Sequence, residues 1–256
     1  MKIAVISDIH GNLTALKAVL KDCRDLAIEK IWCLGDIIGY GANPWECWSL
    51  VQSIIEPNHL IKGNHEDALE NPEHLKDFTK NAQAGVNYAR RQLELPENVS
   101  YQEQVKQGIL STLPLMLRLT ESGVALVHGD YLNPADWSYV HDEAEAEAQM
   151  NALPESVNFL GHTHVPFVFQ SGGRGLIDRL PDRFELNPDC KFLINPGSVG
   201  QPRDSDCRSC YALLEIEGNQ KFFTLRRVFY DIDATATAIR QAGLPNYLAE
   251  RLYRGE

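Results

Sequence analysis

The sequence predicts an α/β fold, because short apolar runs of strand length alternate with helical segments through the first two thirds of its 256 residues. Residues 3–6 form a continuous apolar run, as expected of a strand that is covered on both faces. Further strands are expected at residues 31–34, 59–61, 124–127 and 157–160. After residue 165 the apolar residues alternate, and the runs 211–216 and 221–228 flank a turn-forming segment, which predicts an antiparallel second sheet.

The segments between these strands carry helix signals. Asn12 or Thr14 can cap a helix that continues to about Arg24. Pro44 suits the first turn of a helix that reaches Val51. Residues 75–93 have helical spacing, with one face formed by Phe78, Ala82, Val86 and Ala89.

The rest of the chain predicts two more helices, at 142–150 and at 233–252, and the second is expected to break at Pro245. The segment 172–188 is rich in Gly, Pro, Asp and Arg and is expected to form a loop. Because no linker is recognisable, residues 1–256 are expected to form a single domain.

The composition excludes some partners. The formal net charge of −11 makes the chain a poor binder of nucleic-acid backbone or anionic membranes, because such binding depends on Lys and Arg. The sequence has no apolar run near the ~20 residues of a membrane span and no signal-peptide core, so a cytoplasmic location is expected. Cys207 and Cys210 form a CxxC pair without the second pair that a zinc site needs, so we expect two incidental thiols.

Five short motifs of Asp, Asn and His each follow one of the expected strands. They are Asp8-Ile9-His10, Gly35-Asp36, Gly63-Asn64-His65, His128-Gly129-Asp130 and Gly161-His162-Thr163-His164. Each motif alone has an ordinary explanation as a turn, a helix cap or a buried histidine. Ligands of open α/β sheets bind beyond the carboxyl ends of the strands, so the five motifs together predict one binding site. The remaining histidines, His59, His74 and His141, are expected to be structural.

At these motifs the chain resembles the calcineurin-like metallophosphoesterase superfamily, whose pattern of Asp-x-His, Gly-Asp, Gly-Asn-His, His and Gly-His-x-His occurs here in order from residue 8 to residue 164. The resemblance implies a four-layer α/β/β/α sandwich of two mixed sheets flanked by helices. It also implies two metal ions, one bound by Asp8, His10, Asp36 and His164 and the other by Asp36, Asn64, His128 and His162. Asp36 would bridge the ions, and His65 would face the substrate.

Two further segments resemble a bacterial subgroup near phosphodiesterases and diadenosine tetraphosphate hydrolases. They are Gly39-Tyr40-Gly41 and residues 195–204. Within the second segment, Arg203 could clamp a phosphate group. The chain departs from the family pattern at Glu66, where Asp is usual, and the sequence does not reveal the carboxylate that orients the catalytic histidine in related phosphatases.

A set of oxygen and imidazole ligands without thiolate suits Mn²⁺, Fe or Zn²⁺. Two divalent ions against the charges of Asp8 and Asp36 would leave the site positive, so a phosphate ester could bind inside an acidic protein. The expected reaction is in-line attack on phosphorus by a hydroxide that bridges the metals, with His65 protonating the leaving oxygen or stabilising the charge of the phosphorane.

Several alternatives remain open at this stage. The expected partner is a small phosphorylated substrate such as a nucleotide, and residues 195–204 favour dinucleoside polyphosphates slightly over phosphodiesters. A phosphoprotein (Ser/Thr) phosphatase, a metal-dependent amide or ester hydrolase, and a non-catalytic metal-binding scaffold of the same fold are the other functions that this pattern permits.

Overall fold

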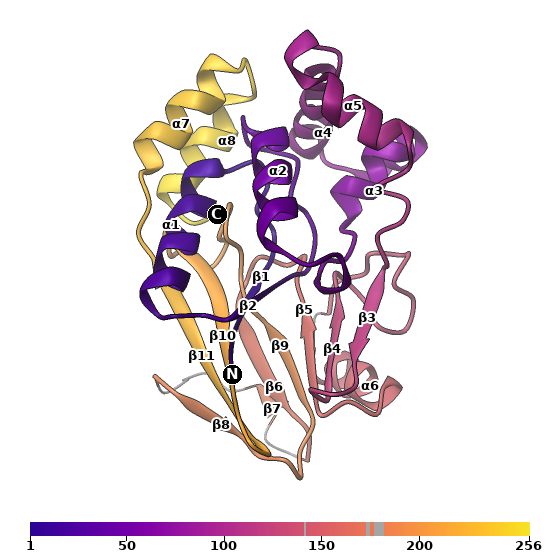
Figure 1. The fold of residues 1–256 in the computed structure, drawn as a ribbon, viewed down its shortest axis with the longest axis vertical. Coiled ribbons are helices and arrows are strands. Elements are labelled where there is room, and N and C mark those ends of the chain that lie inside the picture. Colours follow the sequence, from indigo (N-terminus) through magenta and orange to yellow (C-terminus); the bar gives the residue numbers. More distant parts are fainter. Residues whose placement is uncertain (141, 173–174, 177–181) are drawn as a thin grey trace.

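The computed structural model describes residues 1–140, 142–172, 175–176 and 182–256. Two β-sheets pack face to face, with helices on their outer faces (Figure 1). One sheet has the strand order β2-β1-β10-β11-β8: Lys30–Cys33, Lys2–Ile6, Ser209–Glu217, Gln220–Val228 and Phe184–Leu186. The other has the order β3-β4-β5-β9-β6-β7: Met116–Leu119, Val124–Val127, Val157–Leu160, Phe192–Asn195, Phe167–Gln170 and Gly175–Leu176.

The burial of β1 explains the four layers. Ile3 and Val5 pack between the sheets, while Ala4 and Ile6 point to the opposite face and pack under α1 (Leu13–Asp25) and α2 (Pro44–Ile54). Because both faces of the strand are covered, its sequence is continuously apolar. Strands β4 and β5 divide their side chains between the inter-sheet core and a cluster that includes Met150 of α6 (Glu143–Ala152). The expected α/β/β/α sandwich of two mixed sheets is therefore confirmed.

The division of strands between the sheets differs from the expectation. The hairpin β10–β11 does not belong to a separate antiparallel sheet, because β10 pairs antiparallel with β1, with Lys2 opposite Glu215 and Val5 opposite Ala212. Strand β6, which also has alternating residues, pairs with β9 in the other sheet. Alternation reveals that a strand is half-covered, but it does not identify the strand's neighbour, so this prediction was wrong.

Two local predictions also need correction. Residues 59–61 are not a strand, because Pro57–His59 form a 3-10 helix and Leu60 makes only an isolated parallel bridge to Cys33. The expected loop 172–188 contains the short strands β7 and β8, and the rest of it lies partly outside the described residues. Strands β3 and β9 and helix α5 (Val99–Lys106) were not expected.

Most of the expected helices are present. Asn12 caps α1 by accepting from the N–H of Ala15, and α4 (Lys80–Leu93) begins later than expected, after a 3-10 helix at Pro72–Asp77. The C-terminal segment forms α7 (Ile232–Gln241), α8 (Asn246–Glu250) and a 3-10 helix at Arg251–Tyr253. The remaining elements are α3 (Asn64–Glu70) and a 3-10 helix at Pro96–Asn98. Among the described residues, no helix is long and apolar enough to span a membrane.

The fold brings the carboxyl ends of four strands to one place. Strand β1 is parallel to β2 in one sheet, and β4 is parallel to β5 in the other. The segments that follow these strands are joined by main-chain hydrogen bonds, from Asp8 N–H to Gly35 O and from Gly161 N–H to His128 O. Four of the five motifs therefore begin at a shared rim of the sandwich.

We expect Asn12→Ala to lower the free energy of unfolding by about 2–4 kcal/mol. The Asn12 side chain caps α1, donates to the carbonyl of Gly200 at 2.9 Å and accepts from the hydroxyl of Thr235 at 3.0 Å. Urea unfolding in the presence of chelator measures the change. Asn43→Ala is the control, because Asn43 precedes α2 without capping it and should change stability by less than about 0.5 kcal/mol. Equal effects of the two substitutions would contradict this account.

Candidate active site

The predicted ligands meet in one buried cluster. Three overlapping groups have potential ligand atoms within 4.8 Å of one another: Asp8, His10 and His164; His10, Asp36 and His65; and Asp36, His128 and His162. Asn64 joins the cluster because its Oδ1 lies 3.1 Å from Nε2 of His128. All seven predicted ligands and His65 are thus brought together, at the end of strands from both sheets.

Asp8 and Asp36 occupy different positions in this cluster. Oδ1 of Asp8 makes no hydrogen bond, although Nε2 of His164 lies 3.2 Å away and Nε2 of His10 lies 3.7 Å away. Oδ2 of Asp36 lies 3.6 Å from Nε2 of His10 and 3.3 Å from Nε2 of His128. Asp36 therefore lies between the two groups of imidazoles, where the predicted bridging ligand belongs.

Main-chain carbonyl groups fix the orientation of three imidazoles. Nδ1 of His10 lies 3.0 Å from Ile38 O, Nδ1 of His128 lies 2.7 Å from Leu34 O, and Nδ1 of His164 lies 2.7 Å from Gln201 O. A carbonyl oxygen only accepts, so each Nδ1 carries a proton and each Nε2 faces the cluster, where its lone pair can bind a metal ion. Nε2 of His10 and Nε2 of His164 lie only 3.0 Å apart. Two lone pairs that face each other at this distance suit a shared cation.

The main chain at these residues is strained. Asp8, His10, Asp36, His162 and His164 all have positive φ angles, between 49° and 68°. Non-glycine residues in this left-handed region cost about 1–2 kcal/mol each and occur mostly at functional sites. Neighbouring glycines make room for the cluster, since a Cβ atom at Gly63 would lie 2.2 Å from Oδ1 of Asp36. The glycines in the motifs are therefore required by close packing.

The electrostatics suit neutral imidazole ligands beside ionised carboxylates. Burial lowers the pKa of His162 to about 4 and that of His164 to about 3, so both rings are neutral at neutral pH. At His128, burial also lowers the pKa, but the charges of Asp36 and Asp8 and the hydrogen bonds of the ring together outweigh it and raise the pKa to about 9. A cation bound beside Asp36 would take the place of that proton. The donor set therefore fits divalent metal ions.

The His65 ring is held mainly by packing. Its main-chain N–H donates to Oδ1 of Asp36 at 2.9 Å, and its ring lies 5.0 Å from the ring of Phe78, between centroids. Nδ1 of the ring makes no hydrogen bond, and burial lowers the pKa of the imidazole well below its usual value. Asp67, two residues away, bonds instead to His74. Within the described residues, the carboxylate that lies within 4.0 Å of the ring is that of Asp36, itself a proposed metal ligand, so no separate carboxylate plays the orienting role that related phosphatases suggested.

Glu66 has a structural role that the sequence could have revealed. Its carboxylate accepts main-chain N–H groups of Asp36, Ile37, Ile38 and Gly63, at distances from 2.8 to 3.1 Å. These bonds hold the segment after β2 against the start of α3. A glutamate three residues after a helix cap is a known capping signal, so Glu66 anchors the main chain at Asp36, one of the predicted ligands.

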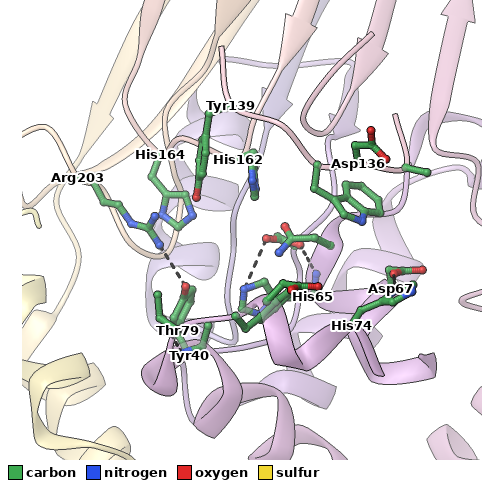
Figure 2. Close-up of a pocket in the computed structure, with 17 residues that line it drawn as sticks. Tyr40, His65, Asp67, His74, Thr79, Asp136, Tyr139, His162, His164 and Arg203 are labelled. Atoms are coloured by element: carbon green, nitrogen blue, oxygen red, sulfur yellow. Dashed lines mark hydrogen bonds and ion pairs between the residues drawn. The ribbon is translucent and has the colours of Figure 1, made fainter. Parts of the chain in front are cut away.

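A pocket of about 460 Å³ opens above the cluster. Figure 2 shows Arg203 on one side of it, Asp67, His74 and Asp136 on the opposite side, and His65 and His162 between them. Its aromatic lining consists of Tyr40, Phe78, Trp137 and Tyr139. The sequence analysis did not find these four as site residues, because aromatic residues in loops have no diagnostic spacing.

The other residues that the sequence analysis discussed do not belong to the cluster of predicted metal ligands. His59 pairs with Glu56 away from the pocket, His74 lines the pocket wall in contact with Asp67, and His141 lies outside the described residues. Cys207 and Cys210 are free thiols, and neither lines the pocket. Arg203 does line it, and its guanidinium has no carboxylate within 4.0 Å among the residues that the structure describes.

Known proteins share both the sequence and the fold. A family model described as the calcineurin-like phosphoesterase superfamily domain matches residues 1–219. An uncharacterized protein of Methanocaldococcus jannaschii is 36% identical over 258 residues, which cover 99% of this chain and 98% of that protein. The crystal structure of a metallophosphoesterase from Sphaerobacter thermophilus is 34% identical with a TM-score of 0.81, over the whole length of both chains.

A shorter match concerns an enzyme of named substrate class. The symmetrical bis(5'-nucleosyl)-tetraphosphatase of Sodalis glossinidius is 36% identical over 67 residues, which cover 26% of this chain and 24% of that enzyme. The longer matches span most or all of the chain and agree with the buried Asp, Asn and His cluster. The chain therefore belongs to the calcineurin-like phosphoesterase superfamily.

Proposed function

We propose that the protein hydrolyses a phosphodiester or a dinucleoside polyphosphate with the help of two divalent metal ions. The position of Asp36 carries this proposal. Its carboxylate lies within 4.0 Å of imidazoles from both ends of the cluster, as a ligand shared by two ions would. Paired ions about 3.5–4 Å apart are the usual means of stabilising both the attacking and the leaving oxygen in phosphoryl transfer.

The proposed ligands divide into two sets that share Asp36. Asp8, His10 and His164 complete the first set, and Asn64, His128 and His162 complete the second. Oxygen and imidazole donors without thiolate suit Mn²⁺, Fe or Zn²⁺. When bound, such ions supply positive charge for the phosphoryl group and an activated water.

His65 is the proposed donor to the leaving oxygen: it would protonate this oxygen or, as a neutral ring, donate a hydrogen bond that stabilises the charge of the phosphorane. It lines the pocket beside Asp36, with Oδ2 of Asp36 3.9 Å from its Nε2, and it stands outside the two proposed ligand sets. A non-catalytic scaffold would need the ligands but would have no need for this residue. The presence of His65 in the pocket beside the cluster therefore favours an enzyme over a non-catalytic scaffold.

Arg203 is the proposed anion-binding group of the substrate pocket. Its guanidinium has no carboxylate partner in the described part of the chain and can pair with oxygens of a phosphate. The aromatic side chains in the pocket lining suit a planar group such as a nucleobase. The similarity of a 67-residue segment to a bis(5'-nucleosyl)-tetraphosphatase supports a dinucleoside polyphosphate as one substrate.

The proposed function predicts metal-dependent cleavage of bis(p-nitrophenyl) phosphate. We expect treatment with chelator to abolish release of p-nitrophenol and Mn²⁺ to restore it, because the cluster holds the reactive water through its ions. A parallel panel should include diadenosine tetraphosphate, 2',3'-cyclic AMP, a phosphoserine peptide and p-nitrophenyl acetate. Inhibition by vanadate would distinguish phosphoryl transfer from amide or ester hydrolysis. If Mn²⁺ binds but no phosphate ester is cleaved, the protein is a scaffold and the proposal is wrong.

Asp36→Asn should remove both metal and activity. The substitution takes away the negative charge that two ions would share, so we expect a loss of turnover greater than the roughly 10–100-fold seen for residues that only support a ligand. Metal analysis after gel filtration and diester hydrolysis measure the two effects. Asp130→Asn is the matched control, since Asp130 follows β4 at the same rim and bonds to main-chain N–H groups and Gln149. A variant at position 36 that keeps two metals and full turnover would exclude the bridging role.

His65→Ala should lower kcat by about 10²–10⁴-fold, the usual contribution of a positioned acid, while two metals remain bound. His74→Ala is its control, because His74 lines the same pocket and its ring bonds to Asp67. The effect should shrink for diesters with a better leaving group, since their leaving oxygen needs less protonation. A loss of only a few-fold with the metals in place would remove His65 from the mechanism.

A further inference from the structure

Tyr40 contacts both His65, the proposed donor to the leaving oxygen, and Arg203, the proposed anion-binding group. It follows Asp36 by four residues in the segment after β2, and Figure 2 shows it below Arg203 and beside His65. Its main chain is left-handed, with a φ angle of 48°, which is unfavourable for a residue with a bulky side chain. A strained residue beside a reactive cluster indicates a function for its placement.

The ring of Tyr40 contributes to the orientation of His65. The two ring centroids lie 4.9 Å apart, and the ring of His10 lies 4.6 Å from each of them. On another side, a Cβ atom at Gly39 would lie 2.0 Å from Nδ1 of His65, so the imidazole rests against the main chain there. Nδ1 of this imidazole makes no hydrogen bond, and Oδ2 of Asp36 lies 3.9 Å from its Nε2, so packing against Tyr40, Gly39 and Phe78 contributes most of its orientation.

The hydroxyl group of Tyr40 contacts Arg203. Nη2 of Arg203 donates to this hydroxyl at 3.4 Å and to Oε1 of Gln201 at 2.9 Å. The guanidinium carbon also lies 5.7 Å from the centre of the tyrosine ring. With no carboxylate partner in the described residues, the arginine depends on these two neutral groups for its direction. Its remaining N–H groups stay available for an anion.

The C-terminal helices pack against Tyr40. It belongs to a buried cluster with Ile239, Leu248 and Leu252, which come from α7, α8 and the C-terminal 3-10 helix. On α4, a Cβ atom at Gly85 would lie 2.2 Å from the main-chain nitrogen of Tyr40, so the helix packs directly against it. The C-terminal helices lie beyond residues 1–219, which match the family model. They thus support one side of the pocket.

We propose that Tyr40 is a positioning residue that acts through two neighbours: its ring orients the His65 imidazole, and its hydroxyl orients the Arg203 guanidinium. One side chain thereby sets the separation between the proton donor and the anion-binding group. This inference rests on the proposed phosphoesterase function.

Tyr40→Phe tests the hydroxyl alone. We expect KM for bis(p-nitrophenyl) phosphate to rise about 3- to 10-fold with little change in kcat, because the ring and its contact with His65 remain. The dissociation constant of inorganic phosphate, measured by calorimetry on the Mn²⁺-loaded protein, should rise by a similar factor. In an Arg203→Gln background the same substitution should change neither value further. A full additional effect in that background would show that the hydroxyl does not act through Arg203.

Tyr40→Leu tests the ring. Leucine is not β-branched, so it tolerates the left-handed main chain no worse than other large residues. We expect kcat to fall about 10-fold or more while the metal content stays the same, and we expect less than about a 3-fold further fall when His65 is already alanine. A fall of equal size in the His65→Ala background would overturn the role of the ring.

Tyr88 provides the matched controls. Its side chain belongs to the same buried cluster, and its hydroxyl donates to the carbonyl of Ala42 at 3.1 Å. Tyr88→Phe and Tyr88→Leu should reproduce any general loss of stability without the selective changes in KM, kcat and phosphate affinity. If the Tyr40 variants behave like these controls while the wild type cleaves the diester, the inference about Tyr40 is wrong. A wild type that neither cleaves phosphate esters nor binds phosphate would overturn the proposed function and this inference with it.

Discussion

The hydrogen bonds between histidine rings and main-chain carbonyl groups are the constraint on which the site depends. His128 follows β4 in one sheet, but its Nδ1 bonds to Leu34 O, which follows β2 in the other sheet. His10 and His164 bond in the same way to carbonyls of different segments. Each bond fixes a ring and joins two segments, so a shift of either sheet would turn a proposed ligand away. The packing of the sheets and the geometry of the cluster are therefore a single property of the fold.

This geometry has an energetic cost. Five residues of the cluster have positive φ angles, and at about 1–2 kcal/mol each their strain reaches roughly 5–10 kcal/mol, close to the whole stability of an ordinary domain. The apolar core between the sheets, with Val5, Phe159 and Phe192 fully or almost fully buried, must offset it. An isolated loop could not hold these angles. The cluster therefore lies directly at the ends of buried strands.

The sequence predicted the clustered Asp and His residues because their spacing is local. Asp8 and His10, or His162 and His164, lie two residues apart at the end of an apolar run, and such a pattern can be recognised without knowledge of the fold. The pairing of β1 with β10 joins residues more than 200 positions apart, and no local pattern records it. Tyr40 was noted only as part of a resembling segment, because its role depends on Arg203 and on the C-terminal helices. Contacts between distant segments are what the sequence alone did not provide.

Arg203 differs from the six arginines that pair with a carboxylate among the described residues. The chain has 35 acidic residues against 24 Lys and Arg, so carboxylates are plentiful. Six arginines pair with one within 4.0 Å: Arg118, Arg183, Arg208, Arg226, Arg227 and Arg254. Arg203 lines the pocket and bonds only to neutral groups among the described residues, those of Gln201 and Tyr40. Arg90 also bonds only to neutral groups, among them the carbonyls of Ala68 and Leu69, but it does not line the pocket. Arg203 does line it, where an anion from outside can pair with its guanidinium. The local charge of the site, not the net charge of the chain, therefore decides what it binds.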